Sequence, residues 1–168
     1  MGLRSDHATG RSFGRRGQTP VIPGTGARFR CNMISAITNR GKLNFMVFKE
    51  RFEADLLKTF LSRLIKQSEN KVFIIMDRHP VHRSVKVKKW LAENEEHIRM
   101  FFLPSYSPEL NPDEVLNQDV KSNAVGRKRA HNLREMINHI RSFLWGRQRQ
   151  PGIVTKYFQE KHVQYAAL

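Results

Sequence analysis

The chain has 168 residues, of which 39% are hydrophobic, and this suits a single domain with an ordinary core rather than a disordered tail. Its 30 lysine and arginine residues against 15 acidic residues give a net charge of +15, which favours a polyanionic partner, most often nucleic acid. No run reaches the roughly 18 to 20 apolar residues of a membrane-spanning helix, and the single cysteine, Cys31, excludes an internal disulfide. We therefore expect a reducing, cytoplasmic setting and no membrane partner.

The first third of the chain predicts an arm followed by a β-hairpin and a helix. Residues 1–28 are rich in glycine and arginine without hydrophobic periodicity, so we expect a basic loop or extended arm there. Two β-rich runs at 28–38 and 42–50 flank the turn sequence "NRG" and predict a hairpin. Residues 52–69 repeat apolar side chains at helical spacing, which predicts an amphipathic helix.

The middle of the chain predicts a strand, a helix and a second strand. Residues 71–77 form an apolar run that ends in Asp77, which is typical of a parallel strand covered on both faces. A short helix with Ser84 as its N-cap is expected over 84–96, and a second buried strand over 98–104. We expect four aromatic side chains of this region and of the last long helix to belong to the core: Phe101, Phe102, Phe143 and Trp145.

The last third of the chain predicts helices. The segment "LPSYSPELNPDE" leads into a helix expected over 112–126, and a further helix is expected over 132–146. Residues 151–168 are expected to form a C-terminal helix or tail. We therefore predict one α/β domain over residues 29–150, with a mixed sheet flanked by helices.

Two carboxylates lie at positions where α/β folds often bind ligands. Asp77 lies at the carboxyl end of a predicted parallel strand, the edge at which α/β proteins place their binding sites. The alternative is that Asp77 only anchors the following loop through backbone N–H groups. The helix expected at Pro112 begins with Asn111 as N-cap and Glu114 as the reciprocal residue of a capping box. Capping alone therefore stays an open alternative for Glu114.

Together with the net charge, the two acids indicate chemistry on a phosphodiester. Two divalent metal ions held by a few carboxylates can activate the attacking oxygen and stabilise the leaving one. Carboxylate oxygens suit Mg²⁺ or Mn²⁺, and Mg²⁺ keeps several waters, so that few protein ligands are needed. Asp77 and Glu114 are thus the candidate catalytic residues and metal ligands.

Two segments resemble a known family of enzymes. The sequences "VFIIMDRHPVHRS" at 72–84 and "FFLPSYSPELNPDEVLNQDVK" at 101–121 resemble the second and third acidic motifs of the DDE transposases of the mariner superfamily, in particular its bacterial insertion-sequence branch. The match is continuous from Leu103 to Pro112, and the separation of the two acids is close to the spacing that the family uses. The segment "GRRGQTPVIPGTGARFRCNMISAIT" at 14–38 also resembles the family.

The resemblance implies a ribonuclease-H-like fold in which three acids bind two divalent metal ions and cut DNA at the ends of a mobile element. Asp77 and Glu114 would be the second and third acids. The family's first acid lies on a first strand that, by this resemblance, would fall just before Met1. Asp6 follows that position without an apolar run before it, so we do not expect it to serve instead. We therefore expect an N-terminally truncated domain that lacks its first strand and cleaves DNA weakly or not at all.

The residues around the two acids are expected to support the site or to contact DNA. The supporting residues are His79, His82, Asn111 and Asp113. The basic residues expected to contact phosphate, rather than only to form solvated helix faces, are Arg78, Arg83, Lys86, Lys88, Lys89, Lys121, Arg127, Lys128 and Arg129. We interpret His82 as a polar loop residue near the acids, where it could touch phosphate, and a zinc site is disfavoured because no cysteine pair lies nearby.

Three functions stay open from the sequence. The leading one is a transposase catalytic-domain fragment that acts on element ends and target DNA. The second is a non-catalytic DNA-binding protein that regulates the full-length transposase by joining its dimers, with a homodimer or heteromer as the assembly. The third is another ribonuclease-H-like nuclease, such as a junction resolvase, which would prefer branched DNA.

Overall fold

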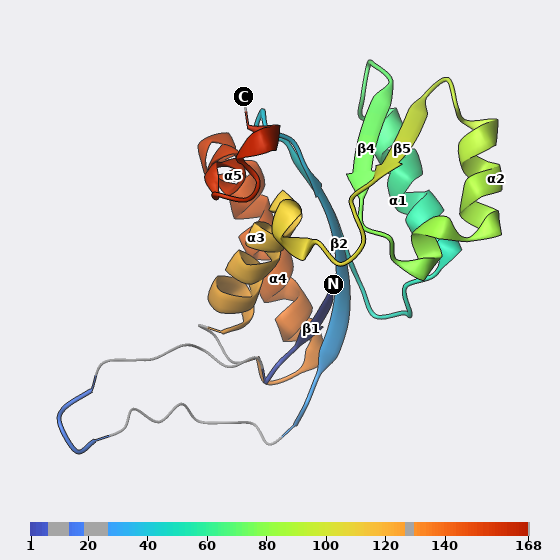
Figure 1. Ribbon diagram of the computed structural model, residues 1–168. Helices are drawn as coiled ribbons and strands as arrows, with labels where there is room; N and C mark the ends of the chain where they lie inside the picture. The colour runs from blue at the N-terminus through green and yellow to red at the C-terminus, as the bar shows by residue number, and fades with distance from the viewer. Residues whose placement is uncertain (7–13, 19–26, 127–129, 168) are drawn as a thin grey trace.

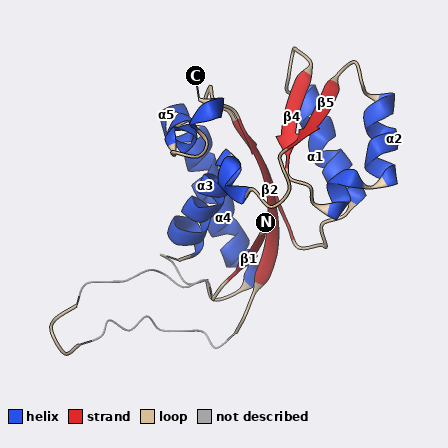
Figure 2. Ribbon diagram, in the orientation of Figure 1, coloured by secondary structure: helices blue, strands red, loops and turns tan. Residues whose placement is uncertain are grey.

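A computed structural model describes residues 1–6, 14–18, 27–126 and 130–167 (Figure 1). The strands form two sheets, one with the order β1–β2–β3 and one that consists of β4 and β5. Figure 2 shows α3, α4 and α5 beside the first sheet, and α1 and α2 beside the second. We predicted one mixed sheet, but among the described residues no strand joins β2 to β4, so the sheet is split there.

The first sheet is antiparallel throughout. Its strands are β1 (Gly2–Arg4), β2 (Arg30–Ile37) and β3 (Leu43–Phe48). The register from Asn32 opposite Phe48 to Ile37 opposite Leu43 confirms the predicted hairpin. Its turn contains Gly41 at φ +87°, where an added Cβ would lie 2.6 Å from the Cβ of Pro151. The turn therefore needs glycine both for its backbone conformation and for this close approach.

Strand β1 lies within the segment for which we expected a basic arm. Leu3 pairs with Cys31 and is fully buried, and Gly2 pairs with Asn32. A run of three residues is too short to show hydrophobic periodicity, and it becomes a strand because β2 supplies its hydrogen-bond partners. Residues 7–13 and 19–26 of the expected arm lie outside the described residues.

The second sheet is parallel, as predicted, and belongs to a strand–helix–strand unit. Its elements are α1 (Ala54–Lys66), β4 (Val72–Met76), a 3₁₀ turn (Pro80–Arg83), α2 (Val85–Glu93) and β5 (Ile98–Phe102). The Ser84 hydroxyl accepts a hydrogen bond from the backbone N–H of Val87 at 3.4 Å, which confirms the predicted N-cap. Leu57, Phe60 and Leu61 of α1 are buried against the sheet and carry most of this second core.

The prediction that β4 is covered on both faces was wrong. Ile74 is buried on the side of α1, whereas Phe73 and Ile75 are 64% and 57% exposed. The reason is that α1 and α2 cover one face of this sheet, and the described residues leave the other face open. Our assignment of aromatic residues to the core also failed for three of them, because Phe101, Phe102 and Trp145 are exposed.

The helices that follow β5 pack on the first sheet. They are α3 (Pro112–Asp119), a π-helical turn (Val120–Val125), α4 (Leu133–Gln148) and α5 (Pro151–Lys156), with 3₁₀ turns at Pro108–Leu110, Tyr157–Gln159 and Gln164–Ala166. The predicted helix over 112–126 is therefore divided into α3 and the π-helical turn. Leu116, Ile140 and Leu144 are fully buried and pack with Leu3 in one core.

A polar network holds α3 to α4. The Asp119 carboxylate accepts hydrogen bonds from Arg147 Nε at 2.7 Å, from the Tyr157 hydroxyl at 2.5 Å and from Asn123 Nδ2 at 2.6 Å. Burial of Asp119 would raise its pKa, but the three donors together lower it below its usual value. This network fixes the direction in which α3 leaves the sheet. None of the described helices is long and apolar enough to span a bilayer.

Candidate active site

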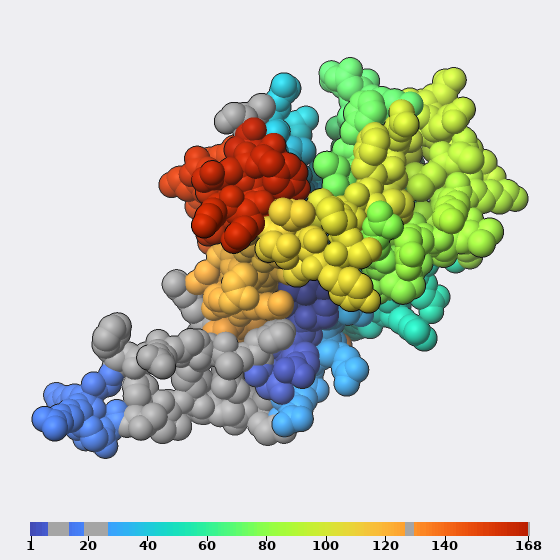
Figure 3. Space-filling view, in the orientation of Figure 1, coloured from blue at the N-terminus to red at the C-terminus, as the bar shows by residue number. Residues whose placement is uncertain are grey.

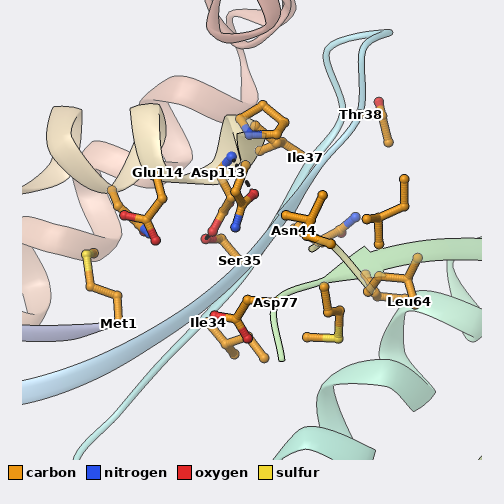
Figure 4. A pocket seen from close by; sticks show the side chains of 18 of the residues that line it. Met1, Ile34, Ser35, Ile37, Thr38, Asn44, Leu64, Asp77, Asp113 and Glu114 are labelled. Atoms are coloured by element: carbon orange, nitrogen blue, oxygen red, sulfur yellow. Dashed lines mark hydrogen bonds between the residues drawn. The ribbon is translucent and has the colours of Figure 1, made fainter. Parts of the chain in front are cut away.

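Asp77 follows the last residue of β4 and lines a groove between the two sheets. The groove has a volume of about 980 Å³ and is bordered by β2 on one side and β4 on the other. Asp113 and Glu114, from the first turn of α3, line the same groove. Figure 4 shows these two carboxylates on one wall and Asp77 across from them, with Ser35 of β2 next to Asp113. The fold therefore brings both sequence-predicted acids to one place.

The Asp77 carboxylate is held by two donors from the turn that follows it. His82 Nδ1 lies 2.8 Å from Asp77 Oδ1, and the backbone N–H of His79 donates to the same oxygen at 3.0 Å. The hydrogen bond from His82, with the smaller contribution of the His79 N–H, lowers the pKa of Asp77 to about 2 although partial burial opposes this. Asp77 is therefore ionised at any physiological pH and has a fixed orientation, while its side chain stays 59% exposed to the groove.

His82 lies next to an acid, as we interpreted it, but in a buried 3₁₀ turn rather than in an irregular loop. The 3₁₀ turn that begins at Pro80 folds the imidazole of His82 back onto Asp77, and His82 is only 7% exposed. The Phe52 ring packs edge-on against it, with the ring centroids 5.6 Å apart. His79 remains exposed, and its Nδ1 accepts a hydrogen bond from the Val81 N–H, so its ring caps the turn. His82 is thus placed to orient Asp77.

The predicted capping of the first turn of α3 is confirmed only in part. The Asn111 side chain accepts a hydrogen bond from the Asp113 N–H at 3.1 Å, and Pro112 occupies the first helical position. The reciprocal capping-box bond expected from Glu114 is not formed. The Glu114 carboxylate is exposed to the groove, and within the described part of the chain it accepts no hydrogen bond. Glu114 is therefore free to bind something that enters the groove.

Asp113 is the most perturbed acid of the site. Its Oδ2 accepts a hydrogen bond from the Ser35 hydroxyl at 2.8 Å, whereas its Oδ1 is fully buried and has no partner among the described residues. Burial raises the pKa of Asp113 to about 6, the Ser35 hydrogen bond opposes the shift, and the neighbouring charge of Glu114 adds to it. A carboxyl group with such a pKa changes its charge just below neutral pH.

The three acids act electrostatically on one point of the groove, the ammonium group of Met1. This group donates a hydrogen bond to the Met33 carbonyl at 2.7 Å. Burial lowers the pKa of the Met1 ammonium, and Asp113, Glu114 and Asp77 each oppose that shift. The three carboxylates therefore act on the same end of the groove.

Two groove residues were missed by sequence reasoning. Ser35 lies in the middle of β2, and its role depends on contact with Asp113 of α3. Asn117 is only 5% exposed, lines the groove one turn after Asp113, and has a buried Oδ1 without a described partner. The helical spacing of Asp113 and Asn117 could have indicated a shared face, but it could not have indicated burial.

The basic residues proposed to contact DNA differ in their surroundings. Arg83, Lys88 and Lys89 are exposed on the turn and helix that follow Asp77. Lys86 forms an ion pair with Asp55, and Arg78 Nε donates to the Leu103 carbonyl at 3.1 Å, so both side chains are partly committed within the fold. The phosphate contacts predicted for Lys121 and for the exposed Arg83, Lys88 and Lys89 stay predictions, because the position of a side chain alone does not test DNA binding. The last three predicted residues, Arg127, Lys128 and Arg129, lie outside the described residues.

Asp6 forms ion pairs that explain its location. Its carboxylate lies 3.3 Å from Arg4 Nε and 3.5 Å from Arg28 Nε. These contacts connect the end of β1 to the segment that leads into β2. Asp6 is not among the residues that line the groove.

Comparison with family models decides the affiliation of the chain. A model described as DDE superfamily endonuclease matches residues 1–137. This chain belongs to that family. The DDE match includes both acids of the groove and β1, so it covers the two sheets and the beginning of α4. No curated protein matches the chain.

Solved DDE transposase structures have the same fold. The Mos1 transposase paired-end complex with left transposon end matches with a TM-score of 0.63 at 16% identity, over 99% of this chain and 54% of that chain. The Mos1 mariner paired-end complex with Mn matches with a TM-score of 0.63 at 12% identity, over 100% and 55%. The catalytic domain of Mos1 mariner transposase matches with a TM-score of 0.51 at 13% identity, over 82% and 81%. The fold is therefore ribonuclease-H-like, and the chain spans about half the length of the first two matches.

The groove meets some of the requirements of a DDE metal site. Carboxylate oxygens are hard ligands that suit Mg²⁺ or Mn²⁺, and Asp77 and Glu114 present them to one groove. Asp113 has a buried oxygen without a partner in the same place. Among the described residues, however, no group of three His, Cys, Asp or Glu side chains is close enough to hold a metal ion. The chemistry of the ligands fits a divalent ion, but the three carboxylates of the groove do not form one close group of ligands.

Proposed function

We propose that this chain is the catalytic part of a transposase of the insertion-sequence branch, which cleaves and transfers DNA strands at element ends. The observation that carries the proposal is the meeting of Asp77 and Glu114 in one groove of a DDE-family fold. The net charge of +15 supports a DNA substrate, since lysine and arginine neutralise phosphates. Solved relatives in complex with transposon DNA support the same substrate class.

In this proposal each groove residue has a defined task. Asp77 and Glu114 would hold Mg²⁺ or Mn²⁺, which supplies the activation of water and the stabilisation of the leaving oxygen. His82 fixes the orientation of Asp77 and keeps its carboxylate ionised by lowering its pKa. Asn111 caps α3 and so sets the direction of the Glu114 side chain. The exposed bases after Asp77 would position the phosphates.

The proposal includes weak activity for this chain. Two predicted acids bind a divalent ion less tightly than three, because each carboxylate adds charge and oxygen ligands. Among the described residues no strand lies between β2 and β4 to fix the walls of the groove. Strand cleavage is therefore expected with Mn²⁺, which is less demanding of geometry than Mg²⁺, before it is seen with Mg²⁺.

The test is nicking of supercoiled plasmid DNA in the presence of Mn²⁺. Wild-type protein should convert supercoiled to open-circular DNA, and Asp77→Ala and Glu114→Gln should both abolish the conversion. Glu109→Gln is the matched control, since Glu109 is an exposed glutamate five residues before Glu114 and lies outside the groove lining. Nicking that persists in Asp77→Ala, or that is lost equally in the control, would contradict the proposal.

Two observations favour a second candidate function. Few carboxylates are available as metal ligands, and the sheet is split between β2 and β4. The chain would then bind DNA without cutting it and regulate full-length transposase by joining its dimers. Metal-independent DNA binding with no nicking by the wild-type protein would support this candidate over the first. A preference for four-way junctions over linear duplex, measured in the same binding assay, would instead indicate a junction nuclease.

A further inference from the structure

We propose that a pocket at the outer edge of β3, which we call the edge pocket, binds single-stranded DNA by stacking one base on Trp145 and holding the adjoining phosphates. The edge pocket has a volume of about 250 Å³ and lies between α1 and α4. Its central residues are Phe45, Arg63, Arg141 and Trp145, none of which lines the groove with the acids. The inference goes beyond the proposed cleavage, and binding at this place needs neither a metal ion nor Asp77.

The edge pocket is positioned by the end of the first sheet. Among the described residues β3 pairs with β2 alone, so its other edge is free of strands. Phe45 packs with the core that contains α4, and Met46 packs with the core that contains α1. The backbone of β3 therefore forms the floor of the edge pocket, and the two helices form its walls. The edge pocket adjoins the groove at Asn44, Leu64 and Gln67, which line both.

The floor of the edge pocket presents a row of backbone donors. Thr38 N–H donates to the Lys42 carbonyl, so by alternation the even-numbered residues of β3 bond to β2. The outward groups belong to Leu43, Phe45 and Val47, and their three N–H groups have no acceptor within the part of the chain that the structure describes. Alternate residues of a strand lie roughly 6.8 Å apart, a spacing comparable to that of successive phosphates along an extended DNA strand.

Two of the three outward carbonyls are already occupied by side chains. Gln148 Nε2 donates to the Leu43 carbonyl at 2.7 Å, and Arg141 Nη2 donates to the Val47 carbonyl at 3.3 Å. Of the outward carbonyls only that of Phe45 stays free. An added peptide strand would need carbonyl acceptors for its own N–H groups, whereas the phosphates of DNA offer acceptors alone. The floor therefore suits a phosphate backbone better than a peptide.

The walls of the edge pocket add positive charge. Arg63 of α1 and Arg141 of α4 both line it, and among the described residues no acidic side chain does. Neither guanidinium forms an ion pair within the described ranges, whereas Arg4, Arg28 and Arg147 each pair with an aspartate. A guanidinium group without a carboxylate partner can bind a phosphate through two parallel donors. The charge of the walls thus matches the donors of the floor.

Trp145 supplies a surface on which a base can stack. It is 53% exposed, although its ring contacts that of Phe45 at a tilt of 60° with the centroids 6.5 Å apart. An exposed indole beside guanidinium groups is an arrangement that binds a base and its phosphate together. A duplex keeps its bases inside the stack and cannot place one on Trp145. The edge pocket therefore selects single strands.

Tryptophan fluorescence tests the stacking. In a Trp90→Phe background all tryptophan emission comes from Trp145, since the chain has two tryptophans. A single strand of about twelve nucleotides, added without divalent metal ions, should quench this emission, and a duplex of the same sequence should leave it nearly unchanged. Trp145→Leu should weaken single-strand binding at least about fivefold, measured by anisotropy, whereas Trp145→Phe should keep most of the affinity. Equal quenching by the duplex, or no quenching by the single strand, would overturn the proposal.

The salt dependence of single-strand binding tests the two arginines. Each phosphate contact to a single strand contributes about 0.7 to the slope of log K against log salt, so Arg63→Gln combined with Arg141→Gln should reduce that slope by about 1.4. The matched control combines Arg51→Gln with Arg134→Gln, which removes the same charge from exposed sites outside the edge pocket. An equal loss of slope in the two double variants would contradict phosphate binding in the edge pocket.

Nitrogen-15 NMR of the wild-type chain needs no substitution. On addition of the single strand, the amide signals of Leu43, Phe45 and Val47 and the indole N–H signal of Trp145 should shift together with one affinity. The amide of Met46 bonds to β2 and is the internal control, so its signal should shift less. Unchanged signals of the outward amides and of the indole at saturating DNA would refute the binding mode.

Two further NMR samples separate the proposal from its alternatives. Asp77→Ala should show the same shifts as the wild type, which keeps this result independent of the nicking assay, and loss of the shifts in that variant would count against the proposal. The acidic peptide acetyl-hexaglutamyl-amide carries negative charge without a base and should not shift the Trp145 indole signal. A shift of that signal by the peptide at a lower concentration than by the single strand would overturn the proposal and indicate an acidic protein as the partner.

Discussion

Asp77 shows how a strand-end acid acquires a fixed state from its own turn. Both donors to its carboxylate come from residues within five positions, the His79 N–H and the His82 imidazole. The strand-end rule indicated Asp77 from the sequence alone. The sequence did not indicate that His82 would be buried, because that depends on Phe52, which approaches from the segment before α1. The Ser35 to Asp113 contact was equally inaccessible, since 78 positions separate the two residues.

Asp113 gives the first prediction, because its buried carboxylate destabilises the fold at neutral pH. Its pKa is about 6 in the folded chain against an ordinary 3.8. An acid with a raised pKa favours folding at pH below about 4, and this contribution is lost as the pH rises through about 6. Asp113→Asn should therefore raise the free energy of unfolding by on the order of 1–3 kcal/mol at pH 7, measured by urea denaturation.

The same variant should come close to the wild type at a pH of about 3.5, where Asp113 is protonated in the folded chain and mostly protonated in the unfolded chain. Glu109→Gln removes a charge from an exposed site, so its effect should stay within about 0.5 kcal/mol at both pH values. A stabilisation by Asp113→Asn that is the same at both pH values would show that buried charge is not its cause.

At the scale of elements, local patterns sufficed where an element is defined by its own residues. The hairpin, α1 and α2 were found because turn chemistry, apolar spacing and the Ser84 cap are local. The faces of β4 and β5 were not found, because an apolar run such as that from Val72 to Met76 does not reveal which of its sides is covered. The π-helical turn after α3 was missed for a similar reason, since its sequence continues the helical spacing.

The cap of α3 gives the second prediction, which concerns how an element positions the site. Asn111 and Asn132 each accept one hydrogen bond from the first turn of a helix, at 3.1 and 2.9 Å. Replacing either with alanine should lower the free energy of unfolding by about 1 kcal/mol, measured in urea. Only Asn111→Ala should also change the titration of Asp113, because Asn111 bonds to the backbone of that residue.

Carbon-13 NMR of the carboxyl groups measures this difference. In Asn132→Ala the midpoint of Asp113 should stay near 6, as in the wild type. In Asn111→Ala the first turn of α3 is less fixed, so Asp113 gains access to water and its midpoint should fall towards the ordinary value. Equal midpoints in the two variants would mean that the cap does not hold Asp113 in its buried position.

At the scale of the whole molecule, the family resemblance predicted the fold, and the comparisons confirmed it. Local sequence patterns could not predict the split of the sheet between β2 and β4. The gap follows from the strand pairing, because no described strand pairs with both β2 and β4. Figure 3 shows the segment between β5 and α3 lying across the boundary of the two halves. This segment carries Glu114 to the side of the groove opposite Asp77, so the long proline-rich connection serves the site.

The third prediction concerns the net charge of +15 and its distribution. If the exposed bases after Asp77 contact phosphates, DNA affinity should fall steeply with salt, and each lost contact should reduce the slope of log K against log salt by about 0.9. Replacing Arg83, Lys88 and Lys89 together with alanine should reduce that slope by about 2 to 3, measured by fluorescence anisotropy on a DNA duplex.

The matched control replaces Arg63, Lys66 and Lys71, which are also exposed but lie at the amino end of β4, away from Asp77. Because the control removes the same charge, an equal loss of slope in both variants would mean that only net charge attracts the DNA. A larger loss in the first variant would place the phosphates at the carboxyl end of β4, next to the acids.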